Sequence, residues 1–300
     1  IYYNIVSYGV DPETERLDYD KIREIALECQ PKMIITGFTS YPFAPDFAKF
    51  REIADEVGAY LLADIAHTAG MAITGDYPNP VGIADVVNFT THKTLNGPRG
   101  AVSITHRKDL YKKIDRAVFP GEQGGPHVNS IAGLDVAMNI AQTQRFHDLQ
   151  HQTARNAIVL AETLQERGIR LAYGGTDTHM LLADCKSIRG ENDATLSGDI
   201  AARILDNVGI VANRNTIPGD PSAFSASGMR FGTPWITQRG LDEEMTRELG
   251  NIIADVLHGC TPYWTPGRKK PVLRAKIDFG VLETARRGIA SLADRCAIDT

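Results

Sequence analysis

The first half of the chain alternates between two patterns of apolar residues. Residues 18–29 and 46–57 carry apolar side chains at helical spacing, and Gly58 is expected to end the second helix. Short apolar runs, typical of buried strands, occur at 32–36, 60–63, 85–90 and 101–105. Strands that alternate with helices in this way predict an α/β fold, with a mostly parallel sheet and helices on both faces.

The second half of the chain has a different pattern. A long helical stretch is expected to end at Gly168. The shorter elements that follow are strands near 169–173 and 179–184 and helices near 195–207, 241–257 and 278–295. Thr261–Pro271, rich in Pro, Gly and Lys, is expected to be a linker to the last helix. We therefore predict a large domain over 1–143 and a smaller α+β domain over 144–300, with a C-terminal extension from about residue 261.

Composition and charge limit the class of partner. Of 300 residues, 43% are hydrophobic and 23% charged, and the formal net charge is −5. This acidic balance is untypical of nucleic-acid-binding proteins, and no apolar run is long enough to span a membrane, so neither partner is expected. Four scattered cysteines without a CxxC pair indicate reduced thiols in the cytoplasm, and neither a disulfide nor a bound metal is expected. Since Ile1 is neither an initiator methionine nor part of a signal peptide, we expect the chain to begin inside a longer protein.

A carboxylate and a lysine follow two of the predicted strands. Asp64 comes directly after one strand, and Lys93 lies 29 residues further on, just beyond the next. Because ligands of parallel sheets bind beyond the carboxyl ends of the strands, both side chains are expected at one sheet edge. Pyridoxal phosphate requires such a pair, since a lysine amine binds its aldehyde as a Schiff base and a carboxylate keeps its ring nitrogen protonated.

Each of these residues also has an ordinary structural interpretation. A single Asp at a strand end usually caps a turn, a single Lys usually lies on the surface, and His67 could be a core histidine with its hydrogen bonds satisfied. The surrounding sequence favours the catalytic interpretation. Thr90-Thr91-His92-Lys93-Thr94 is a polar cluster at the end of an apolar strand, followed by Gly97-Pro98-Arg99-Gly100. A fold does not remove so many polar groups from water without giving them partners.

These segments resemble the central signature of the serine hydroxymethyltransferases. The resemblance holds in order and spacing to about residue 258. Its motifs are Tyr3-Asn4-Ile5-Val6-x-Tyr8-Gly9-Val10-Asp11, Asp64-x-Ala66-His67-x-Ala69-Gly70, Thr90-Thr91-His92-Lys93-Thr94-Leu95-x-Gly97-Pro98-Arg99-Gly100, Ala117-Val118-Phe119-Pro120-Gly121 with Gln123-Gly124-Gly125-Pro126, Gly174-Gly175-Thr176-Asp177 and Ser227-Gly228-x-Arg230-x-Gly232-Thr233-Pro234. The resemblance implies the aspartate aminotransferase-like fold type I of pyridoxal-phosphate enzymes.

The resemblance also implies a set of cofactor contacts. Lys93 would bind the aldehyde, and Asp64 would pair with the ring nitrogen. Ala66 would pack on one face of the ring. His67 and Thr39 would lie near the 3-oxygen of the ring, where family members usually carry Ser in place of Thr39.

Other residues would support the reacting centre. His92 and Thr90 would support the lysine, and Arg99 would lie near the cofactor. Gly125 would lend its backbone N–H to the phosphate of a neighbouring subunit. This last role implies a homodimer or tetramer with shared cofactor sites.

Two residues of the smaller domain would bind substrates. Arg230 would hold the carboxylate of serine, because a guanidinium donates two parallel hydrogen bonds to a carboxylate. Its alternative is a structural salt bridge. Asn215 would help to hold folate, and its alternative is an ordinary turn residue in Asn213-Arg214-Asn215-Thr216.

The activity implied is the reversible conversion of serine and tetrahydrofolate to glycine and 5,10-methylenetetrahydrofolate, a reaction of one-carbon metabolism. The family's N-terminal segment, with its main phosphate loop and proton-transfer glutamate, is not found before Ile1. Two alternatives therefore stay open. One is a folate-independent pyridoxal-phosphate aldolase of β-hydroxy amino acids, and the other is a non-catalytic fragment or subunit that pairs with an intact homologue.

Overall fold

The computed structural model describes residues 3–268 and 271–296, which divide into two compact units. Unit 1 comprises Arg16–His151 together with the segment before Pro12, and unit 2 comprises Pro12–Glu15 and the chain from Gln152 onward. The boundary falls inside one helix, α6 (Gln144–Glu166).

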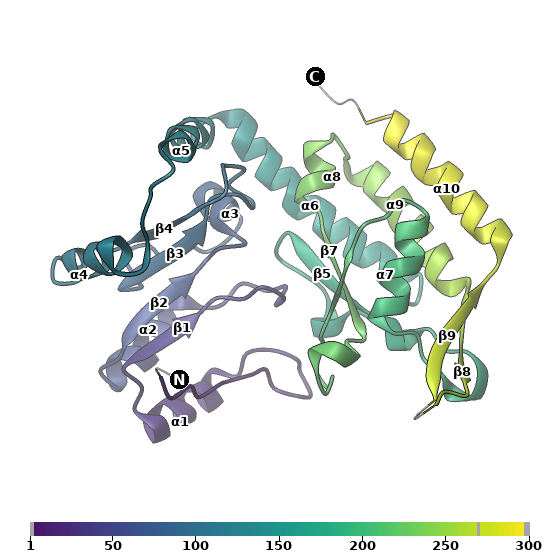
Figure 1. Cartoon of the computed structure of the whole chain (residues 1–300), viewed down its shortest axis with the longest axis horizontal. Coiled ribbons are helices and arrows are strands. Elements are labelled where there is room, and N and C mark those ends of the chain that lie inside the picture. The colour runs from purple at the N-terminus through teal and green to yellow at the C-terminus, as the bar shows by residue number, and fades with distance from the viewer. Residues whose placement is uncertain (1–2, 269–270, 297–300) are drawn as a thin grey trace. The chain divides into compact units, whose positions relative to one another are not determined.

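A four-stranded sheet forms the centre of unit 1. The sheet has the order β1-β2-β3-β4, and these strands lie side by side in Figure 1. Their bounds are Met33–Thr36 (β1), Tyr60–Asp64 (β2), Val86–Thr90 (β3) and Ala101–Ile104 (β4). The first three strands are parallel and β4 is antiparallel to β3, because the ten residues between them are too few for a crossover. The α/β class and the mostly parallel sheet are confirmed.

Two helices form where the apolar spacing predicted them, one before β1 and one between β1 and β2. In α1 (Tyr19–Cys29) the Asp18 side chain caps the first turn, and in α2 (Phe47–Glu56) the Asp46 side chain does so. Phe50 and the neighbouring apolar residues of α2 are buried, and α2 packs on β1 and β2.

Strand β1 is covered more on one side than on the other. Ile34 and Thr36 are buried, whereas Met33 and Ile35 are 47% and 53% exposed. Within the described part of the chain, helices therefore cover this strand fully on one face only. This alternation differs from the burial on both faces that an apolar run such as 32–36 predicted.

One carboxylate joins the beginnings of β2 and β3. Asp85 is 5% exposed and accepts hydrogen bonds from Leu61 N, Arg51 Nη1 and Arg107 Nη1 at 2.8, 2.8 and 2.7 Å. In return, Asp85 N donates to Leu61 O at 2.9 Å. Burial by itself raises the pKa of Asp85, but the Leu61 N–H and the two arginines outweigh it and hold the pKa below its ordinary value.

The predicted long helix up to Gly168 is two helices. After α3 (Ala69–Thr74), α4 (Tyr111–Arg116) and a short turn at Ala117–Glu122, the chain forms α5 (Val128–Ile140) and then α6. The helical stretch is interrupted at Thr143, whose side chain accepts a hydrogen bond from Phe146 N at 3.3 Å and so caps the beginning of α6. The apolar periodicity runs through this break, so the periodicity alone predicted one helix.

Unit 2 contains a second, antiparallel sheet with the order β5-β7-β6. Its strands are Met180–Asp184 (β5), Asn213–Asn215 (β6) and Gly228–Gly232 (β7). The helices of this unit are α7 (Gly198–Asn207), α8 (Pro234–Gln238), α9 (Glu243–His258) and α10 (Phe279–Asp294). Its core includes the buried side chains of Leu160, Leu164, Leu181, Leu205, Met229 and Ile253.

Two predictions for the smaller domain were wrong. Residues 169–173 form no regular strand but a single bridge from Leu171 to Ala183, because the chain then turns through the positive φ angles of Tyr173 and Gly174. The predicted linker begins with a strand, β8 (Cys260–Thr265), which pairs with β9 (Val272–Ile277). Positions 269–270 of that linker and 297–300 of the tail lie outside the described residues.

Among the described helices, none has both the length and the apolar content that crossing a bilayer requires.

Prediction: replacing Asp85 with Ala lowers the free energy of unfolding at pH 7 by about 2–4 kcal/mol, because two arginines and a backbone N–H lose their acceptor. The stability that Asp85 provides is complete above its ordinary pKa of 3.8 and is lost as the pH falls through the lower pKa of the folded state. Denaturant titrations of wild type and Asp85→Ala should therefore converge in acid.

Asp109→Ala is the matched control. It removes an exposed carboxylate that accepts from the same Arg107 at 2.9 Å, and a much smaller loss of stability than in Asp85→Ala is expected. Equal losses in the two variants would contradict the anchoring role of Asp85.

Candidate active site

The loops after β2 and β3 are hydrogen-bonded to each other. Thr90 Oγ1 donates to Ala66 O at 2.9 Å, and Thr94 Oγ1 donates to His67 O at 2.7 Å. Gly70 N in turn donates to Thr94 Oγ1 at 3.0 Å. These bonds bring the segment with Asp64, Ala66 and His67 together with the segment that carries Lys93.

The segment from Thr91 to Gly100 is a closed loop whose conformation is fixed by its own backbone. Thr91 N donates to Gly100 O at 3.0 Å, and Gly97 N donates to Thr91 O at 2.7 Å. Asn96 N donates to the carbonyl of Lys93 at 2.9 Å. The last of these bonds holds the backbone of Lys93, and the residue as a whole is half-buried.

The end of β1 approaches Asp64 closely. Gly37 has φ +144°, and a Cβ at this position would lie 2.0 Å from the carbonyl oxygen of Asp64. Only glycine permits this approach. The Asp64 carboxylate accepts from Ala66 N at 2.9 Å through Oδ1. Thr39, two residues beyond Gly37, is exposed near this strand end.

His92 contributes an imidazole next to the lysine. Its Nε2 lies 3.4 Å from Nη1 of Arg99, a contact at the long end of the hydrogen-bond range. Its Nδ1 is buried and has no hydrogen-bond partner within the described part of the chain. A buried polar atom without a partner is costly, so this nitrogen is a candidate contact for a bound group.

These residues fit pyridoxal phosphate in their chemistry. The half-buried Asp64 carboxylate and the Lys93 amine come from adjacent parallel strands, and Asp64 pairs in register with Asn88, two residues before Thr90. The unpartnered Nδ1 of His92 lies beside the lysine in sequence. A cluster of side chains able to hold a metal ion is absent among the described residues.

Gly125 is not joined to this group of residues by any contact described for unit 1. It lies in an exposed loop before α5 with φ +57°, and no atom lies within 4 Å of the position that its Cβ would take. Its backbone N–H therefore stays a predicted phosphate contact.

Arg230 and Asn215 lie on neighbouring strands of unit 2. Arg230 of β7 pairs with Asn213 of β6, so Asn213, Asn215 and Arg230 are on the same face of the sheet. Arg230 is half-buried, and burial lowers the pKa of its guanidinium. Asp220 closes the loop between the strands, because its carboxylate accepts from Ile217 N and Ser227 N at 3.1 and 2.8 Å.

The cysteines of unit 2 are not suited to nucleophilic chemistry. Burial raises the pKa of Cys260 to about 12 and that of Cys185 further still. A buried thiol that stays protonated is inert.

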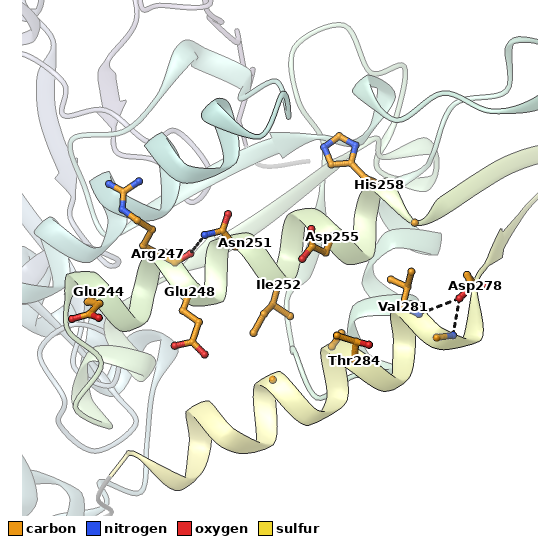
Figure 2. Close-up of a pocket in the computed structure, with 14 residues that line it drawn as sticks. Glu244, Arg247, Glu248, Asn251, Ile252, Asp255, His258, Asp278, Val281 and Thr284 are labelled. Atoms are coloured by element: carbon orange, nitrogen blue, oxygen red, sulfur yellow. Dashed lines mark hydrogen bonds between the residues drawn. The ribbon is translucent and has the colours of Figure 1, made fainter.

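A groove of about 960 Å³ runs between α9 and α10, and Figure 2 shows the side chains that line it. None of the predicted site residues is among them. Its charged groups pair with other side chains of unit 2: Arg247 with Glu166, Asp255 with Arg167, and Glu248 with Arg295. The groove is therefore not the candidate active site.

The support that three residues give to the site was not predicted from the sequence. Gly70 was noted only as part of the motif after Asp64, and neither Gly37 nor Gln150 was noted. The Nε2 of Gln150 donates to Thr94 O at 2.9 Å. The sequence carried one indication for Gln150. It lies four residues after the buried Phe146, so this polar residue is on the buried side of its helix. The glycine contacts depend on distances between loops and had no local signal.

Comparison with known proteins identifies relatives of this chain. A family model described as serine hydroxymethyltransferase matches residues 1–253. The serine hydroxymethyltransferase of Synechococcus sp. (strain JA-3-3Ab) is 49% identical over 301 residues, which cover 98% of this chain and 66% of that protein. That of Rippkaea orientalis (strain PCC 8801 / RF-1) is 49% identical over 257 residues, which cover 85% of this chain and 59% of that protein. The chain thus spans between 59% and 66% of the length of these relatives.

Prediction: Thr94→Val lowers the free energy of unfolding by about 1–3 kcal/mol, because the partly buried His67 carbonyl and the buried Gly70 N–H lose their shared partner. Thr94→Ser, which keeps the hydroxyl group, is the control and is expected to lose clearly less. Denaturant titration measures both, and a Val variant as stable as the Ser variant would show that the hydroxyl group does not join the two loops.

Proposed function

Since this chain belongs to the serine hydroxymethyltransferase family, we propose that it carries out the reversible conversion of serine and tetrahydrofolate to glycine and 5,10-methylenetetrahydrofolate with pyridoxal phosphate as cofactor. The observation that carries the proposal is the pair of hydrogen bonds, Thr90 to Ala66 and Thr94 to His67, that joins the Asp64 and Lys93 loops. The chain matches only part of its relatives' length, so the activity is a proposal for this chain and not an established property.

The residues of unit 1 would hold the cofactor. Lys93 would bind the aldehyde carbon, and the Asp64 carboxylate, held from one side by Ala66 N, would accept the ring N–H. Pyridoxal phosphate, when bound, supplies a protonated ring that takes up electron density from the substrate. His67 and Thr39 are proposed as contacts of the ring oxygen, and Ala66 as a contact of the ring face.

Polar groups around Lys93 would support proton transfer. The Thr90 hydroxyl group is oriented by its bond to Ala66 O, so its hydrogen is committed while its oxygen can still accept a hydrogen bond from a reacting group. The unpartnered Nδ1 of His92 would exchange a proton with the reacting groups.

Two residues of unit 2 are proposed to bind the substrates. A planar guanidinium can donate two parallel hydrogen bonds to the serine carboxylate, and partial burial makes such bonds stronger, so Arg230 suits this role. Asn215, on the same sheet face, is proposed as a folate contact. Fixing the carboxylate also fixes which bond at Cα is presented for reaction.

A homodimer or tetramer with shared cofactor sites is proposed on two features. The N–H of Gly125 lies in an exposed loop, where a second subunit could place a phosphate. The helix that follows exposes several apolar side chains, namely Val128, Ile131, Val136 and Ile140. A cytoplasmic location is proposed because the four cysteines are free thiols.

Prediction: pyridoxal phosphate added to this chain and reduced with borohydride labels Lys93, because its loop presents one half-buried amine beside the Asp64 loop. Peptide mapping locates the adduct, and Lys93→Ala abolishes it. The same preparations are assayed for glycine formation from serine with and without tetrahydrofolate. Folate-dependent conversion is expected from wild type, and none from Lys93→Ala.

Lys108→Ala, at an exposed lysine of the same unit, is the control and should label and react as wild type does. Label spread over many lysines, or label that survives Lys93→Ala, would disprove the cofactor assignment. Serine cleavage that does not depend on folate would favour the aldolase alternative, and binding without turnover would favour the non-catalytic subunit.

Prediction: Arg230→Lys weakens serine binding by roughly tenfold and Arg230→Ala by up to about a hundredfold, since charged hydrogen bonds to the carboxylate are lost. Serine titration followed by the absorbance of the bound cofactor measures the affinity. Arg214→Ala is the control, because Arg214 pairs with Met229 on the opposite sheet face and bonds Asp199. Near-normal serine affinity in Arg230→Ala would remove Arg230 from the substrate site.

A further inference from the structure

Gln150 of α6 contacts the backbone next to the candidate cofactor lysine. Only 2% of its surface is exposed, and its Nε2 donates to Thr94 O at 2.9 Å. Thr94 directly follows Lys93 in the chain. We propose that Gln150 is a positioning residue, which fixes the peptide after Lys93 and thereby the direction in which the Lys93 amine projects. The proposal rests on the proposed function in one respect, the cofactor role of Lys93.

The first turn of α3 packs against the same Thr94 carbonyl that Gln150 contacts. A Cβ at Gly70 would lie 2.3 Å from Thr94 O and 3.1 Å from Gln150 Nε2. The carbonyl of Thr94 is thus enclosed between α3 and α6. A buried carbonyl needs a donor, and Gln150 is the side chain that provides one.

The helix that carries Gln150 is itself anchored to unit 1. One turn earlier, Phe146 packs in a buried cluster with Leu95 and Ala141, so α6 holds the Lys93 loop by an apolar contact as well. At the next residue, His151 Nδ1 lies 2.6 Å from Asp76 Oδ1, and Asp76 Oδ2 accepts from Thr74 Oγ1 at 2.6 Å. Because α6 is anchored in this way, the Gln150 side chain that it carries can hold the Lys93 loop in a fixed position.

The amide is not explained by packing. Oε1 of Gln150 is buried and lacks a hydrogen-bond partner among the described residues. An unpaired buried acceptor is unfavourable, and a leucine of similar volume would fill the space without that cost. What the amide adds is the donor for Thr94 O. Asn96 N donates to Lys93 O, and Gln150 Nε2 donates to Thr94 O. Hydrogen bonds therefore hold the carbonyl groups of both Lys93 and Thr94.

Gln150→Leu removes the donor, and Gln144→Leu makes the same change at an exposed position of the same helix, where Nε2 donates only to Asp148 Oδ1. The first readout uses the chain without cofactor. Hydrogen exchange of the Asn96 and Gly97 amides, which bond to Lys93 O and Thr91 O, is expected to be about tenfold faster in Gln150→Leu than in Gln144→Leu.

The second readout uses the chain loaded with pyridoxal phosphate. The pH midpoint of the visible band of the cofactor bound at Lys93 is expected to shift in Gln150→Leu and to stay unchanged in Gln144→Leu. Gln150→Glu keeps the shape but, when ionised, has no hydrogen to donate. Its amide exchange, compared with Gln144→Glu at each pH, should approach that of wild type only in acid, where the carboxyl group is protonated.

The outcomes separate this proposal from the proposed function. If wild type is not labelled at Lys93, the cofactor role fails, while the exchange of the Asn96 and Gly97 amides still tests the positioning. If Gln150→Leu only lowers the unfolding temperature, with exchange and band midpoint equal to the control, Gln150 is structural and the proposal is overturned. If Gln150→Leu does not fold, Gln150→Glu decides, and the absence of any recovery in acid overturns the proposal.

Discussion

The parallel pairing of β2 with β3 is the constraint on which the candidate site depends. The register that sets Asp64 opposite Asn88 places the carboxyl ends of both strands at one sheet edge, so the polar residues beyond them must meet. Asp85 holds this pairing at the other end of the strands by binding Leu61 N together with two arginines. A slip of one residue would turn the Asp64 side chain to the opposite face, so the chemistry of the site depends on backbone hydrogen bonds far from it.

The same polar groups stabilise the loops and form the site. The hydroxyl groups of Thr90 and Thr94 reach across to carbonyls of the neighbouring loop, so the loops that carry Asp64 and Lys93 are held together by residues of the same sequence motif. Glycines allow this close approach, since Gly37 contacts Asp64 and Gly70 contacts Thr94 with no space for a side chain. A change in the motif is therefore expected to affect folding and function together.

Local patterns predicted α1, α2 and the four strands of the first sheet, and the reason is physical. The two helices and β2 bury apolar side chains of their own, and the helices begin at the recognisable capping residues Asp18 and Asp46. Strand β4 was expected to be buried but is largely exposed, and the short helices α3 and α4 were not predicted. Predictions were wrong where a single side chain or a distant partner decided the outcome. The Thr143 cap divides one apolar periodicity into two helices. The Pro- and Gly-rich segment from Thr261 became a strand because β9 pairs with it.

The sequence by itself determined the family and the α/β class, because these depend on residue types and on their spacing along the chain, and it supplied the motif on which the proposed cofactor site rests. The tertiary structure alone decided which groups support that motif. The bond from Gln150 to Thr94 O joins residues 56 positions apart, and the approach of Gly70 to the same carbonyl depends on how two loops pack. Such contacts arise from the positions of elements in space. The local pattern places Gln150 on the buried side of its helix but does not identify the carbonyl to which it donates.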